Sequence, residues 1–145
     1  MRAVVQRSRG ARVSVAGEVI GQFQGLGLVV LVGVTHSDTD EEARKLAGKL
    51  HGLRIFDGPD GREASIGDLG LPAMVISQFT LYGQLTKGRR PTWELAAPRT
   101  AAEPLVAAVI DELRALGTTV ATGRFGADMQ IELTNEGPIT LILDV

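Results

Sequence analysis

The sequence predicts an α+β fold, in which a mainly antiparallel or mixed sheet is accompanied by two main helices. Short segments with strand-like patterns outnumber amphipathic helical segments, of which there are two. Strands and helices do not alternate regularly, as a doubly wound α/β fold would require. The chain has 145 residues, of which 44% are hydrophobic, which is enough for the core of one ordinary domain over residues 1–145.

The first third of the chain predicts short strands joined by tight turns. Residues 3–8 and 11–17 alternate between apolar and polar side chains, and Ala16-Gly17 predicts a hairpin turn into a strand at 18–23. The run "GLGLVVLVGV" at 25–34 is continuously apolar and is typical of a strand buried on both faces.

The first helix is expected to begin at Asp38, with Glu41 completing a capping box. Its apolar face has helical spacing and consists of Ala43, Leu46, Ala47 and Leu50. The glycine- and proline-rich residues 56–72 predict a loop, and "AMVIS" at 73–77 predicts another buried strand.

A partly basic loop is predicted at 83–99, followed by a second helix capped by Thr100 with Glu103 and ended by Gly117. Pro104 is expected in the first turn, where a missing N–H costs no helical bond. The predicted buried face of this helix consists of Leu105, Val106, Val109, Ile110, Leu113 and Leu116. Three late strands are predicted at 118–123, 128–135 and 138–145.

Composition excludes several classes of protein. The net charge of -2 and pI near 5.7 argue against a general nucleic-acid coat, and 4% aromatic content argues against a stacking platform for single-stranded bases. The absence of cysteine excludes disulfides, thiolate catalysis and cysteine-bound metals. No apolar run approaches the roughly 20 residues of a membrane span, and residues 1–15 lack the apolar stretch of a signal peptide. A cytoplasmic location is expected.

Standard catalytic motifs are missing from the sequence. His36 and His51 have no HExxH-like arrangement, so both are expected at or near the surface and no metal site is predicted. There is no GxSxG elbow, Walker loop or GxGxxG after a strand. The loosely glycine-rich "GQFQGLG" predicts only a turn.

Two segments stand out from this background. In "SQFTLYG", polar Ser77, Gln78 and Thr80 follow an apolar strand, either because the strand surfaces there or because a ligand site opens at its end. Gly137-Pro138 precedes the last predicted strand, although proline removes a backbone donor. It is either a turn at the start of an edge strand or a backbone feature with its own role, and the dipeptide alone does not decide whether the bond is cis.

Together these segments resemble the D-aminoacyl-tRNA deacylase family, also called the D-tyrosyl-tRNA deacylase family. "SQFTL" matches its first signature and "NEGPIT" its second, with Glu136 in place of the usual aspartate. "MRAVVQR", "GRRPTW" with "AAP", and "TGRFGADMQ" resemble further family segments, in order over the full length. "REAS" at 62–65 departs from the usual Lys-Met-Asn-like stretch.

The resemblance implies a homodimeric carboxylic ester hydrolase that removes D-amino acids from tRNA, with active sites at the subunit interface and no metal or cofactor. It implies a pocket at the end of the "SQFTL" strand, with Gly137 and Pro138 reaching in from the other subunit through a cis peptide bond. Arg7 matches the arginine that holds that loop. The residues implied for the catalytic pocket are Ser77, Gln78, Phe79 and Thr80.

The resemblance also suggests how enantiomers are separated. Backbone carbonyls against the substrate α-carbon would leave room for hydrogen but not for an L side chain, so glycyl-tRNA is expected to react as well. The attacking group is left open between Thr80, water and the tRNA 2′-hydroxyl, and backbone N–H groups near Phe79 are expected to hold the oxyanion. A non-catalytic nucleic-acid-binding dimer and a general esterase are the alternatives. Expected contacts with tRNA phosphates are Lys87, Arg89 and Arg90, with Arg99 and Arg124 as further basic candidates.

Overall fold

The computed structural model describes residues 1–86 and 88–145. Its centre is a five-stranded mixed sheet with strand order β6-β5-β2-β1-β7. β1 pairs antiparallel with β2 and β7, whereas β5 runs parallel to both β2 and β6. The strands are β1 (Arg2–Val15), β2 (Glu18–Gly33), β5 (Ala73–Ser77), β6 (Val120–Thr122) and β7 (Met129–Asp144). The predicted α+β class with a mixed sheet is therefore confirmed.

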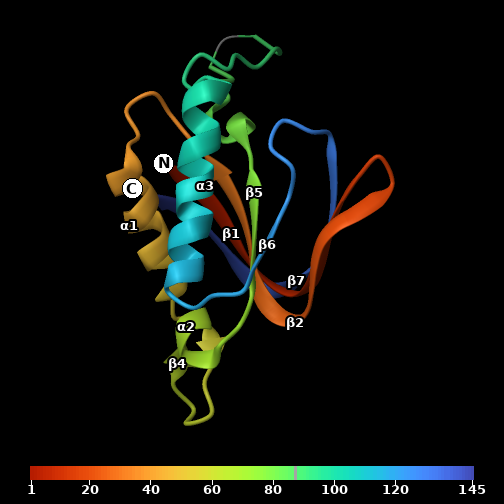
Figure 1. The fold of residues 1–145 in the computed structure, drawn as a ribbon, viewed down its shortest axis with the longest axis vertical. Coiled ribbons are helices and arrows are strands. Elements are labelled where there is room, and N and C mark those ends of the chain that lie inside the picture. The colour runs from red at the N-terminus through yellow and green to blue at the C-terminus, as the bar shows by residue number, and fades with distance from the viewer. Residues whose placement is uncertain (87) are drawn as a thin grey trace.

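Two long helices, α1 (Asp40–His51) and α3 (Arg99–Ala115), lie side by side over one face of the sheet (Figure 1). The two ends of the chain lie next to each other, and the Val145 N–H donates to the Met1 carbonyl at 3.0 Å. Within the described residues, no helix combines the length and apolar character needed to cross a bilayer. The shorter elements are β3 (Phe56–Asp57), β4 (Glu63–Ala64), α2 (Ile66–Leu69) and the 3-10 helix η1 (Phe79–Tyr82).

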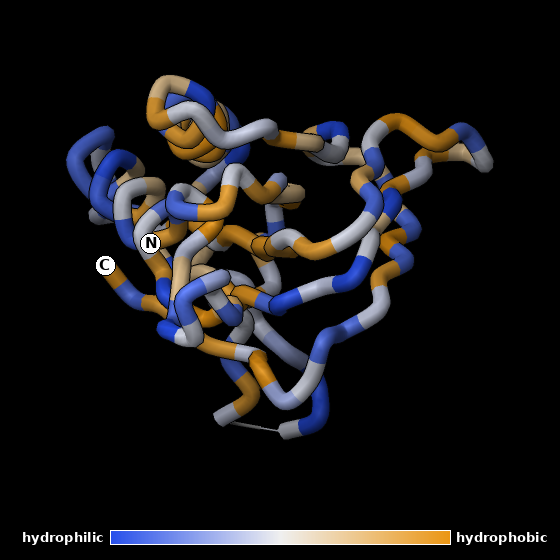
Figure 2. The backbone as a smooth tube through the Cα atoms, turned by 90° about the horizontal axis from the view of Figure 1, so that it is seen from below, coloured by the Kyte–Doolittle hydropathy of each residue, from blue (hydrophilic) through white to orange (hydrophobic). Residues whose placement is uncertain are grey.

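The larger core fills the space between these helices and the sheet. Val5, Val30 and Val75 project from three neighbouring strands, and Leu46 and Leu113 meet them from the two helices. All five side chains are fully buried or nearly so. Figure 2 shows hydrophobic residues (orange) along segments that cross the middle of the fold and hydrophilic residues (blue) mainly in its outer parts.

A smaller core lies on the opposite face of the sheet. It forms because the outer part of β1 bends over that face: the register with β2 shifts between Arg9 and Ala11, and Gly10 has a φ of 92°. This positive φ is readily adopted only by glycine. The buried members of this core are Ala11, Val13, Val29, Met74 and Ile76.

The long strands correct the sequence prediction. β1, β2 and β7 are each continuous where two shorter segments were expected, and Gly137-Pro138 lies inside β7 rather than before a strand. The register between β1 and β7 shifts between Gln6 and Ser8, opposite the Gly-Pro pair. An irregularity of this kind admits a residue without an N–H while pairing continues on both sides.

The first helix begins one residue later than predicted. Thr39, not Asp38, is its N-cap, and Glu42, not Glu41, completes the capping box. The Asp38 carboxylate instead accepts the Thr35 N–H at 2.7 Å and pairs with the Met1 ammonium at 2.6 Å. The predicted apolar face of the helix, Ala43, Leu46, Ala47 and Leu50, is buried as expected.

The second long helix begins earlier than predicted. Pro98 is its N-cap and no side chain caps it, so the expected box of Thr100 and Glu103 is wrong. Pro104 consequently lies inside the helix, where its missing N–H costs the bond to the Thr100 carbonyl. Leu116 lies just past the last helical residue and is 40% exposed, so its predicted burial is also wrong.

Leu113 and Leu116 offer a test of this boundary within one segment. Leu113→Ala is expected to lower the free energy of unfolding by about 2–5 kcal/mol, because Leu113 is fully buried between α3 and the sheet. Leu116→Ala is expected to change it by less than about 0.5 kcal/mol, because the side chain is 40% exposed and is not part of the core cluster. Urea denaturation of both variants measures the difference. Equal losses would place Leu116 in the core.

Two predicted loops contain more order than expected. Residues 56–72 hold the β3–β4 hairpin and α2, whose N-cap Ser65 forms a capping box with Asp68. In the 83–99 loop, Gln84 and Thr92 form a two-way backbone bridge with N···O distances of 2.9 and 3.0 Å. The residues 85–91 that this bridge encloses include Lys87, which lies outside the described residues.

Candidate active site

The carboxyl end of β5 turns sharply into η1. The last pairing of β5 joins Ser77 to Val32, and the Gln78 N–H then donates to the Val32 carbonyl at 2.7 Å. A Cβ on Gly33 would lie 3.1 Å from the Gln78 carbonyl, Leu81 and Tyr82. The missing side chain of Gly33 therefore allows η1 to pack against the end of β2.

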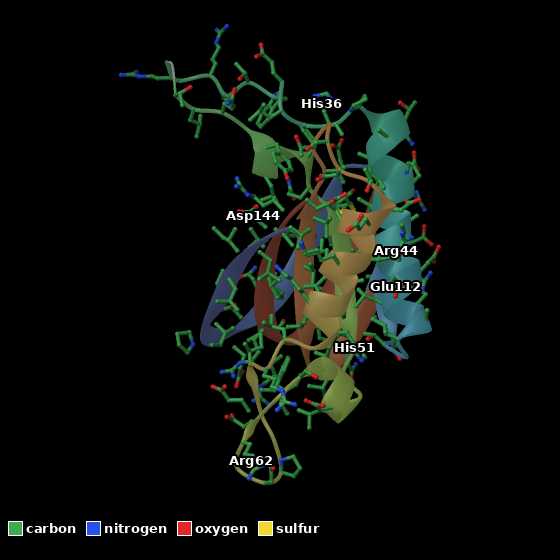
Figure 3. All side chains as sticks on the ribbon, turned by 90° about the vertical axis from the view of Figure 1, so that its left-hand side faces the viewer. His36, Arg44, His51, Arg62, Glu112 and Asp144 are labelled. Carbon is green, nitrogen blue, oxygen red and sulfur yellow. The ribbon has the colours of Figure 1, made fainter. Side chains whose placement is uncertain are left out.

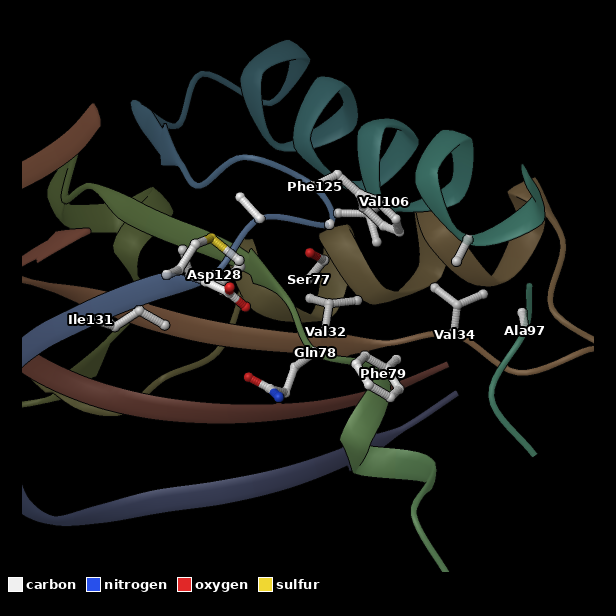
Figure 4. A pocket seen from close by; sticks show the side chains of 15 residues that line it. Val32, Val34, Ser77, Gln78, Phe79, Ala97, Val106, Phe125, Asp128 and Ile131 are labelled. Atoms are coloured by element: carbon white, nitrogen blue, oxygen red, sulfur yellow. The ribbon is translucent and has the colours of Figure 1, made fainter. Parts of the chain in front are cut away.

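A cavity of about 310 Å³ opens beside this turn (Figure 4). Ser77, Gln78 and Phe79 line one side, Val106 of α3 contributes to an apolar wall, and the segment before β7 closes another side. A mostly apolar cavity with a few convergent polar groups is the usual form of a small-molecule or substrate-end site. Of the two origins considered for the polar residues after β5, this cavity favours a ligand site.

The structure brings three of the four predicted pocket residues together. Thr80 is exposed and is not among the residues that line the cavity; its hydroxyl oxygen accepts a hydrogen bond from the Gln78 side-chain amide. The N–H groups of Phe79 and Thr80 start a 3-10 helix and donate to no backbone acceptor among the described residues. Two N–H groups are thus free beside the Gln78 turn.

Sequence reasoning missed a second group of residues that line the cavity. Phe125 and Asp128 come from the segment before β7, and Asp128 is the only carboxylate among the lining residues. The Arg99 guanidinium lies 5.7 Å from the centre of the Phe125 ring and pairs with Glu103 at 3.1 Å. The segment "TGRFGADMQ" was available as a signal, but its place beside β5 depends on the crossover through α3.

The second signature lies elsewhere in the chain. The Gly137-Pro138 peptide bond is cis. Arg7 donates to the carbonyls of Ile55 at 2.6 Å, Glu136 at 3.3 Å and Gly137 at 3.5 Å. The segment is therefore tied to β1 and to the chain before β3 through one guanidinium group.

Glu136, where the family usually has aspartate, has a partner of its own. Its two carboxylate oxygens accept from Arg9 at 2.7 and 2.9 Å. These hydrogen bonds lower the pKa of Glu136, and they raise that of the Arg9 guanidinium. The longer side chain thus keeps an ionic contact next to the Gly-Pro pair.

Within one chain the two signatures do not meet. Arg7, which contacts the Gly137 carbonyl, is aligned across the sheet with Leu28 of β2 and Ala73 of β5. Ala73 lies five residues before Gln78 in the chain. Three strand spacings also separate β7 from β5, so the two signatures lie roughly 20 Å apart by ideal sheet dimensions. Any site that uses both must combine two chains.

His36 is exposed and His51 is half-buried, as the sequence suggested, and neither lines the cavity. His36 contacts the Glu94 carbonyl at 2.9 Å through Nε2, and His51 contacts the Thr118 hydroxyl at 2.9 Å through Nδ1 (Figure 3). Among the described residues, no three histidine, aspartate or glutamate side chains gather as a metal site would require. Tyr82 follows the pocket residues, and burial raises the pKa of its hydroxyl to about 12.

The comparison with known families decides the relationship. The family model described as D-Tyr-tRNA(Tyr) deacylase matches residues 4–144. The chain belongs to this family. Proteins called D-aminoacyl-tRNA deacylase from Streptomyces coelicolor and Acidothermus cellulolyticus are 59% and 58% identical to it, over 100% of this chain and 100% and 99% of theirs.

Solved structures agree with membership of the D-Tyr-tRNA(Tyr) deacylase family. A protein described as c-Myc DNA unwinding element binding protein has a TM-score of 0.91 and 35% identity, and the match covers 100% of this chain and 99% of that one. A probable eukaryotic D-amino acid tRNA deacylase has a TM-score of 0.86 at 18% identity, covering 99% and 98%, and supports the fold alone.

This deacylase-family chain departs from the usual pattern at residues 62–65. Arg62 lies near the tip of the β3–β4 hairpin, at the opposite end of the molecule from His36 (Figure 3). It lies 3.8 Å from Asp60 and is 85% exposed, so the cation remains available to solvent. Ala64 is buried and Ser65 caps α2, so this half of the segment serves the local fold.

Proposed function

We propose that this chain hydrolyses the ester bond between a D-amino acid and the 3′-terminal ribose of tRNA, releasing the free D-amino acid and tRNA. The observation that carries the proposal is the full-length family match together with Ser77, Gln78 and Phe79 lining a cavity at the end of β5. The names of the curated relatives support the same activity. Such an enzyme acts on aminoacyl-tRNA in the cytoplasm, where it removes D-amino acids from tRNA before translation uses them.

A homodimer is part of the proposal, and two features of the sheet support it. β7 is an edge strand of 16 residues, and a long free edge is a surface that proteins usually cover. Across the sheet, Ile142, Val4, Leu31 and Ile76 are aligned Cα partners. This apolar row runs from 67% exposed Ile142 to Ile76, which lines the cavity.

A two-fold contact over this row would place the Gly-Pro segment of one chain near the cavity of the other. Two-fold interfaces use the same patch on both subunits, so one contact completes two sites. This arrangement would bring together the two signatures, which lie far apart within a single chain. Arg7 would then hold the carbonyls of Glu136 and Gly137 in place toward the neighbouring cavity.

The proposed selection between enantiomers is steric. With carbonyl oxygens against the α-carbon, a D-residue directs its hydrogen at the backbone wall and its side chain outward. An L-residue would have to push its side chain into that wall and leave carbonyl groups unpaired. Because glycine presents only hydrogen to the wall, glycyl-tRNA is proposed as a further substrate.

The proposed chemistry uses water or the tRNA 2′-hydroxyl as the attacking group. Thr80 accepts from the Gln78 amide, and an amide donor does not remove a proton from a hydroxyl, so Thr80 lacks the base that a nucleophile needs. The N–H groups of Phe79 and Thr80 would stabilise the tetrahedral oxyanion. Gln78 would position the ester beside them.

The purified protein can be tested against four substrates: D-tyrosyl-tRNA, L-tyrosyl-tRNA, glycyl-tRNA and D-tyrosine ethyl ester. We expect hydrolysis of D-tyrosyl-tRNA and glycyl-tRNA, with L-tyrosyl-tRNA and the simple ester spared. Turnover of the ethyl ester at a comparable rate would indicate a general esterase. Binding of tRNA without release of any amino acid would indicate a non-catalytic nucleic-acid-binding protein, and either result would refute the proposal.

A further inference from the structure

Exposed apolar side chains concentrate in the segment that begins at the cavity residue Phe79. Among the described residues, seven large hydrophobic side chains are exposed, and four of them lie between positions 79 and 95. The six aromatic residues of the chain are similarly uneven, because Phe79 and Phe125 line the cavity and Trp93 contacts Phe79. We call the exposed set the rim patch; it consists of Phe79, Leu85, Trp93 and Leu95.

The centre of the rim patch is held in place by its surroundings. The rings of Trp93 and Phe79 meet edge to face, with centroids 5.3 Å apart and an interplanar angle of 72°. A Cβ on Gly83 would lie 2.6 Å from the Trp93 ring, so the indole packs directly on backbone. The Thr35 hydroxyl donates to the Leu95 carbonyl at 2.6 Å, which anchors the end of the patch. These contacts therefore hold the two exposed aromatic rings in a fixed position.

Positive charge adjoins this patch. Arg89 and Arg90 lie within the residues enclosed by the Gln84–Thr92 bridge, and both are exposed. Neither forms an ion pair with a described residue, whereas Arg2, Arg9 and Arg12 on the sheet are all matched by carboxylates. The cations beside the patch thus remain free to meet an anionic ligand.

We propose that the rim patch seats the unpaired nucleotides that precede the terminal adenosine of tRNA. Their bases would stack against Trp93 and Phe79, and their phosphates would face Arg89 and Arg90. Aromatic faces beside cations are the general means of binding single-stranded nucleic acid, and stacking accepts any base. The inference rests on the proposed function, because Phe79 connects the patch to the cavity that would hold the ester.

The low aromatic content of the chain argued against such a platform, but it describes an average over all residues. A strand end needs only one or two exposed rings to guide a short 3′ tail. Base-paired RNA would present its phosphates and sugars instead of open base faces, so the patch fits an unpaired tail better than a duplex.

A kinetic comparison tests the stacking. For Trp93→Leu, kcat/KM with D-tyrosyl-tRNA is expected to fall about tenfold, the loss typical of removing one base-stacking ring. With D-tyrosyl-adenosine, which lacks the preceding nucleotides, it should stay within twofold. Leu116→Ala removes an exposed apolar side chain elsewhere and serves as the control. A loss shared by both substrates would mean that Trp93 only shapes the cavity, and no loss at all would also overturn the inference.

Trp93 is the only tryptophan, so its fluorescence reports on the patch directly. An RNA hairpin with a four-nucleotide 3′ tail ending in CCA should quench the emission, and the same hairpin with a blunt end should not. The double variant Arg89→Gln/Arg90→Gln should reduce the slope of log affinity against log salt by about 1.4, at about 0.7 per phosphate contact on single strands. Arg44→Gln, another exposed cation, should leave the slope unchanged.

The outcomes separate this inference from the proposed function. If the wild-type protein does not release tyrosine from D-tyrosyl-tRNA, the proposed function has failed. If it does, but Trp93→Leu behaves like the wild type and the tailed hairpin does not quench, only the rim patch proposal has failed. Conversion of the Trp93→Leu variant to a monomer in sedimentation would assign the patch to an interface between copies, which also overturns the proposal.

Discussion

The Gly137→Val variant is expected to keep its fold and to lose at least about a hundredfold in kcat/KM on D-tyrosyl-tRNA, the scale of a small misplacement in an active site. Apart from its two neighbours along the chain, the nearest described atom to a Cβ on Gly137 would be the Asn135 side-chain nitrogen at 3.8 Å. The residue also has no positive φ that a branched side chain would strain. The added methyl groups should therefore act mainly on whatever faces this exposed segment in the proposed homodimer.

Mixing two inactive variants tests whether that neighbour is the cavity of a second chain. Gln78→Ala damages the cavity and leaves the Gly-Pro segment intact, whereas Gly137→Val does the reverse. In a mixed dimer, one site carries both defects and the other carries neither. Random reassortment makes half of all dimers mixed, so about a quarter of the wild-type activity should return.

The measurements are thermal unfolding, sedimentation and single-turnover release of tyrosine from D-tyrosyl-tRNA. Refolding each variant alone provides the control, and it should remain inactive. Restored activity would be difficult to obtain if each site were built from one chain. Failure of mixed dimers to recover activity, with both variants folded and dimeric, would contradict the shared site.

The sequence predicted the elements of the sheet better than their lengths. Separate strands were predicted on either side of Gly10 and on either side of Gly137-Pro138, but β1 and β7 run through both places. Register shifts in the pairing of β1 absorb these residues, and such irregularities depend on the partner strands. A local pattern contains no information about a partner more than 100 residues away.

Helix ends show the same limit on a smaller scale. Asp38 and Thr39 are both good capping residues, and the sequence pattern alone chose the wrong one. The structure favours Thr39 because the Asp38 carboxylate already binds the Thr35 N–H and the Met1 ammonium. The second of these contacts joins residues 37 positions apart, so only the assembled fold could decide between neighbours.

The candidate site likewise contains some residues that a local sequence pattern could predict and others that it could not. Ser77 and Gln78 could be found because polar residues at the end of a buried strand are a local signal, and the cavity is there. Phe125 and Asp128 could not be placed beside them, because their position follows from the parallel pairing of β5 with β6. Arg7 was linked to the Gly137 segment by family resemblance, and the structure gives that link as hydrogen bonds.

The second large effect is expected in Arg7→Met, which removes those hydrogen bonds and should weaken the selection between D- and L-substrates. Arg7 donates to three backbone carbonyls, including those of Glu136 and Gly137. Each hydrogen bond from a charged donor contributes about 1.5–3 kcal/mol. Their loss should therefore let the Gly137-Pro138 segment move. If the carbonyls form the wall against L side chains, a mobile segment should admit L-residues.

The expected result is that kcat/KM for L-tyrosyl-tRNA rises while that for D-tyrosyl-tRNA falls less than tenfold. The D-to-L ratio should then drop by about 10- to 100-fold, because about 1.4 kcal/mol corresponds to a factor of ten. Both enantiomers are measured at the same enzyme concentration, and thermal unfolding confirms that the variant is folded. Arg7→Lys should not restore the ratio, because an ammonium lacks the planar fork that reaches three carbonyls.

Arg9→Met is the matched control for this change. Arg9 is the same residue type two positions along β1, but it pairs with the Glu136 carboxylate and is 57% exposed. Its loss removes a cation and an ion pair next to the segment while every carbonyl contact of Arg7 remains. The D-to-L ratio should therefore change less than threefold, since exposed ion pairs contribute little. Equal losses of selection in both variants would assign the effect to charge, and unchanged selection in Arg7→Met would remove the support for a wall of backbone carbonyls.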